Sequence, residues 1–500
     1  MAVIDPSHSS TRRGHSAVPN TQVLLIGLDS ADRGLVDRWC DAGHLPAIAA
    51  LRDRGVWANL STPEAVGDDA VWASFATGVP PGRHGRFFWN TVDRGRYDWV
   101  MSRDRPPPVP PFWVALSDAG RRVAVIDVPK CPLTPNLHGR QLVDWLTHGR
   151  DYAKTQSDPP EWAEEVLRQF GGDATDVPTG EFLCAGTPLP EEKRPVFRHH
   201  MLDGIERKSR LATEVLAEGG WDLFLVVFKE SHCAGHKFLG DDGAATPDLL
   251  EVYRAMDRAV GRLVEAAGEG CLSLVFSDLG MSTNETGEHF LDQALARLEP
   301  GMITWRQRLR RRLRWNATKD KRAGRLAFQW EHNEMSGAIR FNLHGREPSG
   351  LVRPGAEHEE LRRRLTRELL ALRDPDSGRP VVRAVIDTAT AFPGEETGRL
   401  PDLLAEWERS GPLVGATSPA LGVLRVGPHP YRPGNHVSGG FCIAAGPGIA
   451  ARTERPDASL LDIAPTVARL LAVDLPGRNG RTIDAFVGIE EARPTVAQSP

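Results

Sequence analysis

The sequence predicts an α/β fold: a doubly wound, mostly parallel sheet flanked by helices, with cap-like insertions. Short apolar runs of strand length alternate along the chain with helical segments, which is the order of a parallel sheet whose strands are connected by helices. The clearest apolar runs are 22–28, 221–228 and 272–276. Their near-continuous hydrophobicity indicates strands that are buried on both faces.

The N-terminal part of the chain contains several strand and helix signals in alternation. A polar tail, residues 1–20, is expected to be disordered, and the first strand follows at 22–28. The next expected elements are helices at 33–41 and 46–54, a strand at 56–61, a helix from about residue 70, a helix at 112–119 and a strand at 122–127. Proline-rich segments at 103–111 and 128–137 predict loops, because proline lacks the N–H that a helix or a central strand uses.

The remainder of the chain contains two segments that do not fit this alternation. Residues 150–195 are polar and rich in proline and glycine, and they predict an insertion over the functional site. A helix at about 197–218 leads into the strand 221–228, and a second insertion is expected at about 300–335. We therefore expect one α/β domain over residues 21–485, with these two insertions, and a flexible tail over 486–500.

Composition and charge narrow the class of protein. The 500 residues carry a formal net charge of −5, and this near balance of acids and bases argues against a nucleic-acid binder. The six cysteines are scattered without a CxxC pair, which is typical of buried thiols in a reducing compartment. The N-terminus lacks the apolar core of a signal peptide, and no segment has the ~18 apolar residues of a membrane span. A cytoplasmic protein is expected.

The most informative segment follows the strand 221–228. His232 and His236 lie four residues apart just after this strand, and ligands of open α/β sheets gather at the carboxyl ends of the strands. If the segment turns helically, the two imidazoles could share one cation. The alternative is a pair of surface histidines beside a structural glycine.

Other strand ends carry similar side chains. Asp29 follows the first strand, Asp278 follows the strand 272–276, and His436 precedes the apolar run 441–449. An aspartate after a strand is often only the N-cap of the next helix. Several such acids and histidines together indicate a site for divalent metal ions.

The order of these segments resembles the alkaline phosphatase superfamily, most closely its type I phosphodiesterase/nucleotide pyrophosphatase branch. The resemblance spans about residues 22–475, nearly the whole chain, and implies an alkaline-phosphatase-like fold. Besides the two-histidine segment, the residues that carry it are 27–32, 43–46, 51–55, 71–78, 81–85, 277–281, 434–436 and 462–466.

The resemblance implies that two metals are held by two groups of ligands. The first group maps onto His232, His236 and His436, where His232 replaces the family's aspartate. Three imidazoles suit zinc, with room for a water-derived fourth ligand.

The second group departs further from the family. It maps onto Asp29, Asp278 and the position of the family's Thr/Ser nucleophile, which is Asp68 here, or Asp69 if the loop slips by one residue. Leu279 replaces the family's histidine and cannot bind metal. Three carboxylates form an oxygen-only set for a second divalent metal such as Mg²⁺, Mn²⁺ or Ca²⁺, and the set is also open to Zn²⁺. The alternative is a decayed site with one metal or none.

Two functions of different class follow. The first is a metal-dependent hydrolase, or a transferase, acting on a phosphate or sulfate ester or a nucleotide-like diester, with an anionic small molecule as substrate. The second is a catalytically silent relative that binds metal or an anion and serves a biosynthetic or regulatory partner; the missing Thr/Ser nucleophile favours it. Within the enzyme, Asp68 is either the nucleophile or a metal ligand that leaves the attack to activated water.

Two basic residues are candidates for substrate binding. Lys229 directly follows the strand 221–228, at the edge where ligands gather. Arg346 follows a strand-like segment at 336–343 and could form a fork onto phosphate or sulfate, although an Arg–Glu surface pair is an equal alternative.

The arginine-rich segment 306–314 has no place in this site. Leu309 and Leu313 recur in it at helical spacing, and Trp315, directly after it, extends the apolar set. An anionic partner, an acidic membrane surface and guidance of phosphorylated substrate are functional interpretations. A solvated helix docked through its leucines is the interpretation that the sequence favours.

Overall fold

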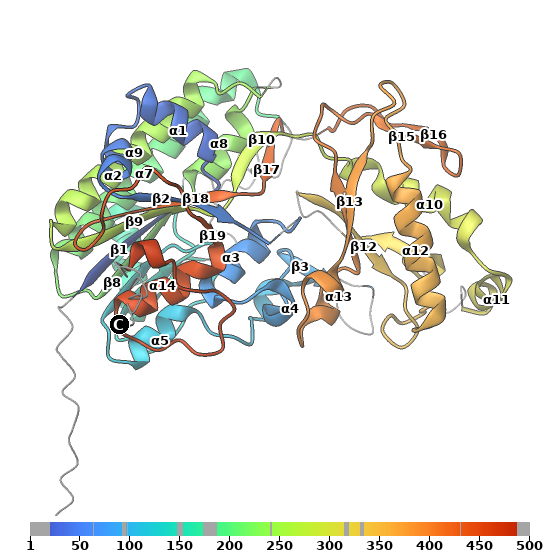
Figure 1. Cartoon of the computed structure of the whole chain (residues 1–500), viewed down its shortest axis with the longest axis horizontal. Helices are drawn as coiled ribbons and strands as arrows, with labels where there is room; N and C mark the ends of the chain where they lie inside the picture. Colours follow the sequence, from blue (N-terminus) through green and yellow to red (C-terminus); the bar gives the residue numbers. More distant parts are fainter. Residues whose placement is uncertain are drawn as a thin grey trace, which may run out of the picture.

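A nine-stranded sheet forms the centre of the protein (Figure 1), in the order β19-β2-β18-β9-β1-β8-β5-β6-β7. Its strands are β1 (Gln22–Leu28), β2 (Val56–Ser61), β5 (Val123–Ile126), β6 (Gly139–Val143), β7 (Gln156–Asp158), β8 (Leu223–Phe228), β9 (Cys271–Ser277), β18 (Gly440–Ala445) and β19 (Asp457–Ser459). The computed structural model describes residues 21–63, 65–92, 97, 99–147, 154–173, 188–240, 243–314, 320–330, 335–430 and 432–487.

The sheet is mostly parallel, as the sequence predicts. β1 pairs in parallel with β8 and β9, β5 pairs in parallel with β8 and β6, and β19 pairs in parallel with β2. β18 runs antiparallel between β2 and β9, and β7 runs antiparallel to β6 at one edge. In this register Leu28 lies opposite Phe228 and Gly27 lies opposite Phe276. The residues that follow β1, β8 and β9 therefore emerge at nearly the same level.

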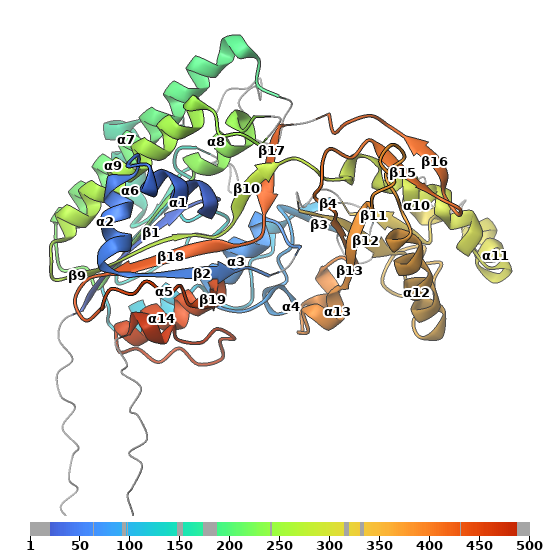
Figure 2. The same cartoon turned by 45° about the horizontal axis from the view of Figure 1, so that its top comes forward.

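Helices cover both faces of this sheet (Figures 1 and 2). On one side are α1 (Arg33–Asp41), α2 (Pro46–Arg54), α6 (Pro160–Phe170), α7 (Arg194–Ala217), α8 (Glu230–Phe238) and α9 (Pro247–Ala267). On the other are α3 (Asp68–Thr77), α5 (Phe112–Asp118) and α14 (Ile463–Leu470), with the short α4 (Pro81–His84) following α3. Side chains of a strand alternate between faces, so Leu24 and Ile26 of β1 join the first apolar core while Val23 and Leu25 join the second.

A second lobe lies beside the main sheet; we call residues 288–425 the cap lobe (Figure 2). Its four-stranded antiparallel sheet has the order β11-β12-β14-β13, and it has an apolar core of its own. The elements are α10 (Glu288–Met302), α11 (Trp305–Arg314), β11 (Ala327–Gln329), β12 (Ser336–Phe341), α12 (Ala356–Leu370), β13 (Val382–Asp387), α13 (Thr388–Ala391), β14 (Leu403–Trp407), β15 (Gly415–Ser418) and β16 (Gly422–Arg425). The insertion expected at 300–335 is only part of this lobe.

The structure describes only part of the segment 150–195. β7 extends the edge of the main sheet, and α6 packs on the first core through Trp162, Val166 and Phe170. These residues recur at helical spacing, so residues 160–170 bury an apolar stripe in the main domain. Residues 148–153 and 174–187 lie outside the described residues, as do the two predicted tails, 1–20 and 488–500.

Two small ribbons complete the fold. β3 (Asn90–Val92) pairs with β4 (Trp99–Met101), and β10 (Gly280–Thr283) pairs with β17 (Gly434–Val437). The β10–β17 ribbon stands at the end of β9, between the main sheet and the cap lobe (Figure 1). Within the described residues, no helix combines the length and apolar character that crossing a membrane requires. The five cysteines there are buried free thiols, as predicted.

Candidate metal centre

The carboxyl ends of the central strands carry the polar groups of the candidate site. Asp29 follows β1, Lys130 comes four residues after β5, and Asp278 follows β9, and all three side chains are buried. Ser30 and Lys130 have φ angles of 56° and 57°, in the left-handed region that residues other than glycine adopt uncommonly. Such backbone conformations cluster at functional sites, because the surrounding structure must hold them in place.

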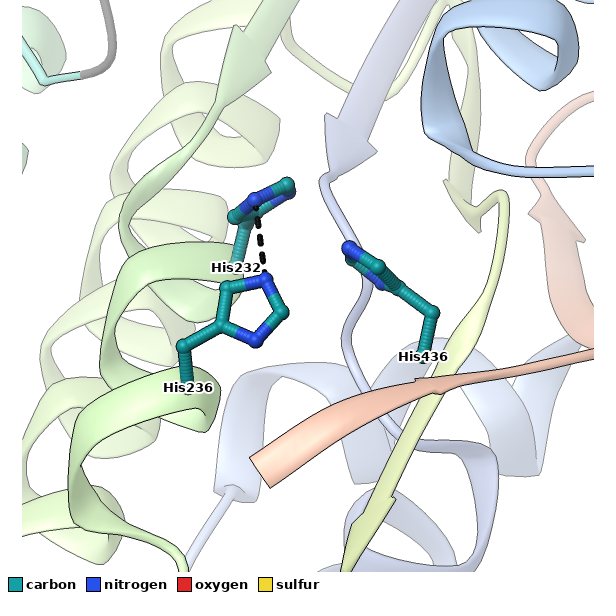
Figure 3. A group of neighbouring side chains, drawn as sticks. All are labelled: His232, His236 and His436. Carbon is teal, nitrogen blue, oxygen red and sulfur yellow. Dashed lines mark hydrogen bonds between the residues drawn. The ribbon is translucent and has the colours of Figure 1, made fainter. Parts of the chain in front are cut away.

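Three buried histidines converge beside these strand ends (Figure 3). His232 and His236 lie one turn apart on α8, and His436 reaches them from β17. Each pair of rings has its centroids 4.7 Å apart, and one ligand atom from each residue lies within 4.8 Å of the others. The structure therefore brings together the three imidazoles of the first predicted ligand group.

Ring orientation supports a shared ligand position. The Nδ1 of His236 lies 2.9 Å from the carbonyl oxygen of Gly434, an acceptor, so this nitrogen carries the proton. The Nε2 of His236 then offers its lone pair toward the Nε2 of His232, 3.2 Å away. Three imidazoles that meet in a buried space suit zinc or a similar borderline cation.

Two glycines allow the histidines to approach. A Cβ at Gly434 would lie 2.1 Å from the carbonyl oxygen of Gly235, and a Cβ at Gly235 would lie 2.7 Å from the Cγ of Met281. Met281 is in turn the partner of His436 in the β10–β17 ribbon. Side chains at the two glycine positions would push α8 and this ribbon apart and separate the imidazoles.

Asp29 connects the histidines to the carboxylates. One of its oxygens accepts hydrogen bonds from Trp72 Nε1 at 3.2 Å and from the Ser30 hydroxyl at 3.0 Å. The other oxygen lies 3.4 Å from the Nδ1 of His232. A proton on this nitrogen would face the carboxylate and leave Nε2 toward the three-histidine cluster. Asp32 of the same loop has the simpler role of N-cap to α1, through Leu35 N–H.

Asp278 is fully buried beside Asp29. Its carboxylate accepts the Ser30 N–H at 2.8 Å. Burial raises the pKa of Asp278 well above its usual value, the charge of Asp29 raises it further, and the Ser30 N–H opposes this only in part. Two buried carboxylates whose charges act on each other favour sharing a proton or a cation.

Asp68 begins α3 and is also buried. One oxygen accepts the N–H of Asp69 at 2.8 Å, and the other lies 4.0 Å from the Nδ1 of His232. Asp68 therefore lies beside the histidines, whereas Asp69, the alternative by one residue, faces Lys130 at 3.8 Å. Leu279 is buried in the apolar core under the sheet, where it offers no ligand atom.

The three carboxylates are spread more widely than the three histidines. Within the described part of the chain, His232, His236 and His436 are the one set of three ligand residues whose atoms lie within 4.8 Å of one another. The geometry thus supports a histidine site directly. Asp29, Asp68 and Asp278 lie near the histidines, but their carboxylate oxygens do not all lie within 4.8 Å of one another.

Neither predicted substrate-binding residue faces the cluster. The ammonium group of Lys229 donates to Asp127 at 2.8 Å, inside a buried network that also includes Lys208. Arg346 lies in the cap lobe, where its guanidinium binds both oxygens of Asp402 at 2.7 Å and Glu347 at 2.8 Å. The ion-pair alternative for Arg346 therefore describes the structure. In both cases a carboxylate held nearby by the fold engages the basic group.

A family model matches this chain and confirms the family that its motifs resemble. A sequence model described as type I phosphodiesterase/nucleotide pyrophosphatase matches residues 23–426, most of the chain. The chain belongs to this family. No curated protein sequence matches it closely enough to be counted as similar.

Solved structures show the same fold at low sequence identity. The phosphonoacetate hydrolase of Sinorhizobium meliloti 1021 is 16% identical, with a TM-score of 0.52 over 91% of this chain and 96% of that one. The alkaline phosphatase PafA is 15% identical, with a TM-score of 0.57 over 95% of this chain and 100% of that one. Human ectonucleotide pyrophosphatase/phosphodiesterase 5 is 15% identical, with a TM-score of 0.50 over 92% and 97%. The alkaline-phosphatase-like fold predicted from the sequence is thus confirmed.

In this phosphodiesterase-family chain, the structure adds basic residues that sequence reasoning missed. Lys130 is buried, with its ammonium group 4.0 Å from Asp68 and 3.8 Å from Asp69. Arg86 is buried too, and its guanidinium donates to the carbonyl oxygen of Lys130 at 3.1 Å. Lys130 comes shortly after a strand that the sequence does predict. Because ligands gather at the carboxyl ends of such strands, this position could have identified Lys130 as a candidate. Its position in a proline-rich loop concealed it.

Proposed function

We propose that the chain is a metal-dependent phosphoester hydrolase that binds zinc at His232, His236 and His436. The observation that carries the proposal is the convergence of these three buried imidazoles at the carboxyl ends of the strands, beside buried aspartates. Membership of the phosphodiesterase/nucleotide pyrophosphatase family supports hydrolysis of a phosphate ester. The phosphonoacetate hydrolase structures, which contain phosphonoacetate or phosphonoformate, support a small phosphorus oxyanion as the substrate class.

The residues of the chain divide the work of such a site. The three histidines would hold the cation, and Asp29 would favour the tautomer of His232 that leaves its Nε2 free to bind. A zinc ion held there would lower the pKa of a bound water to about 7, and so supply a nucleophile at neutral pH. The burial of all four side chains keeps these interactions strong, because water does not screen them.

Lys130 would provide positive charge for the anionic substrate. Lys130 follows β5 by four residues, in a left-handed backbone conformation, with its ammonium group close to both Asp68 and Asp69. A phosphate group that enters beside Asp68 would meet the ammonium group of Lys130, whose side chain is already ordered by burial. Arg86, whose guanidinium holds the carbonyl oxygen of Lys130, positions the loop.

Asp68 is proposed to act as a ligand or charge partner, and water as the nucleophile. Asp68 lies 4.0 Å from both an imidazole and an ammonium group, so cationic or hydrogen-bonding partners already engage its charge. A carboxylate in this position is a weak nucleophile, and its acyl-phosphate product would be labile. Asp29, Asp68 and Asp278 would be the ligands of a second, harder cation such as Mg²⁺ or Mn²⁺.

Metal content and turnover, measured on the same preparation, test the proposal. Protein purified without chelator is analysed for metals and assayed with a phosphate diester, a phosphate monoester and a sulfate ester of p-nitrophenol. The assays are repeated after metal removal and after addition of Zn²⁺, Mn²⁺ or Mg²⁺. Hydrolysis of a phosphate ester that is lost on chelation and restored by a metal ion is the expected result.

The same measurements can overturn the proposal. Bound zinc without turnover of any ester would favour the silent metal-binding relative, the second function that the missing Thr/Ser nucleophile suggests. Turnover that survives complete removal of metal would contradict the role of the histidines. Faster hydrolysis of the sulfate ester would be consistent with the metal site but would replace phosphate esters by sulfate esters as the substrate class.

A further inference from the structure

Helix α11 presents an unusual outward face at the far end of the cap lobe (Figures 1 and 2). Trp305 is 69% exposed and Leu309 is 52% exposed, and they lie one helical turn apart. Trp305 has the largest exposed fraction among the large apolar side chains of the described residues. The expectation that the helix docks through its leucines is therefore wrong at Leu309; the side chains of Leu313 and Trp315 lie outside the described part.

Polar groups attach the inward face of α11 instead. Gln307 is buried and donates to Glu357 at 2.7 Å, and Arg310 binds the same carboxylate at 2.8 Å. Arg311 pairs with Glu299 at 3.1 Å. These contacts hold the helix on α10 and α12 in one orientation. Trp305 and Leu309 consequently remain on the outside.

Three arginines surround the exposed apolar pair. Arg308 and Arg312 follow Trp305 and Leu309 by three residues each, so they lie on the same side of the helix. Arg306 places its guanidinium 5.3 Å from the centre of the Trp305 ring. All three are exposed, and none of them pairs with a carboxylate of the described residues. The outward face therefore combines apolar contact area with unneutralised positive charge, on a chain whose net charge is −5.

We infer that this face of α11 binds the surface of an anionic lipid bilayer. A helix that lies in a membrane interface presents tryptophan and leucine to the acyl boundary and arginine to the lipid phosphates. Nucleic acid would use the arginines but would leave Leu309 exposed to water. The inference is independent of the proposed function, because α11 contains none of the candidate site residues.

Flotation with lipid vesicles tests this inference. The full chain is mixed with vesicles of phosphatidylcholine alone, or of phosphatidylcholine with phosphatidylglycerol, at low and high salt. Binding is expected only to the anionic vesicles, and it should weaken as salt screens the arginines. Arg306→Gln/Arg308→Gln/Arg312→Gln should reduce the partition coefficient about a hundredfold, since each arginine near such a surface contributes roughly a factor of five. Trp305→Ser/Leu309→Ser should reduce it about tenfold or more.

A matched control separates this face from exposed leucine and arginine in general. Leu167→Ser/Arg168→Gln changes a neighbouring exposed pair on α6 of the main domain and should leave vesicle binding unchanged. The altered α11 side chains lie outside the cores, so thermal unfolding should match that of the unaltered chain and exclude misfolding as the cause. Equal binding to neutral vesicles, no binding to anionic vesicles, or binding to a DNA duplex without binding to anionic vesicles would each overturn the inference.

Discussion

Arg409 donates a hydrogen bond from its guanidinium Nη2 to the carbonyl oxygen of His436 at 2.7 Å. Arg409 lies two residues after β14, in the cap lobe, whereas His436 is the cluster histidine that β17 supplies. The two lobes are thus joined at the backbone of a candidate metal ligand. Orientation of the cap lobe and geometry of the histidine cluster are expected to depend on each other.

Arg409→Ala should weaken metal binding without removing a ligand. The β17 strand would lose the donor that holds His436 in place, and loss of such an outer contact lowers metal affinity by about 10–100-fold. Competition with a chelator of known affinity measures the change. Arg383→Ala, at an exposed arginine of the same lobe that pairs with Glu406, is the control and should leave the affinity unchanged. Equal affinities for both variants would show that the link is not used.

His236→Ala should remove about one equivalent of metal per chain. Two imidazoles remain in this variant, and they are too few for a stable buried zinc site. Elemental analysis after purification without chelator measures the loss. His138→Ala, at an exposed histidine outside the cluster, should retain the metal. Unchanged metal content in the His236 variant would contradict the assignment of the cluster.

The stability of the cap lobe should depend on pH through Asp402. Burial alone would raise the pKa of Asp402, but the charge and hydrogen bonds of Arg346 outweigh it and hold this pKa below its usual value. A lowered pKa stabilises the fold above the unfolded-state value of about 4, and this stabilisation is lost as pH falls through the folded-state pKa.

Asp402→Asn should therefore lower the free energy of unfolding by about 2 kcal/mol at neutral pH, and by less in acid. Denaturant unfolding at neutral and acidic pH measures this difference. Asp376→Asn changes an exposed ion pair with Arg425 and should cost far less. A cost for the Asp402 variant that does not shrink in acid would contradict the role of the ion pair.

Much of the fold could be predicted because local patterns and tertiary structure agree. The strand at 22–28, the helices at 33–41 and 46–54 and the strand at 56–61 coincide with the observed elements. Their apolar residues are those that pack in the two cores. The cap lobe was underestimated because its strands and helices repeat the same alternation, and only pairing shows that β11, β12, β14 and β13 form a separate antiparallel sheet.

The candidate site was predictable where its residues follow apolar strands. His232, Asp29 and Asp278 share this position, and the register of β1 with β8 and β9 brings them together. Lys229 also follows an apolar strand, but its ammonium group binds Asp127. Its direction is set by this buried ion pair, which the sequence pattern does not show. The basic residue beside the aspartates is Lys130, which a proline-rich sequence concealed.

The last prediction concerns the role of Asp68. If water attacks the substrate, Asp68→Asn should keep an oxygen ligand and lower turnover by only about 10–100-fold. If Asp68 is the nucleophile, turnover should disappear, because an amide does not form the acyl phosphate that replaces the leaving alcohol. Hydroxylamine added during turnover distinguishes the two directly, since it converts an acyl phosphate into a hydroxamate. We expect an unmodified Asp68 in the mass spectrum of the digested protein. A hydroxamate at this residue, together with an inactive Asp68→Asn variant that retains its metal, would establish covalent catalysis in place of direct attack by water.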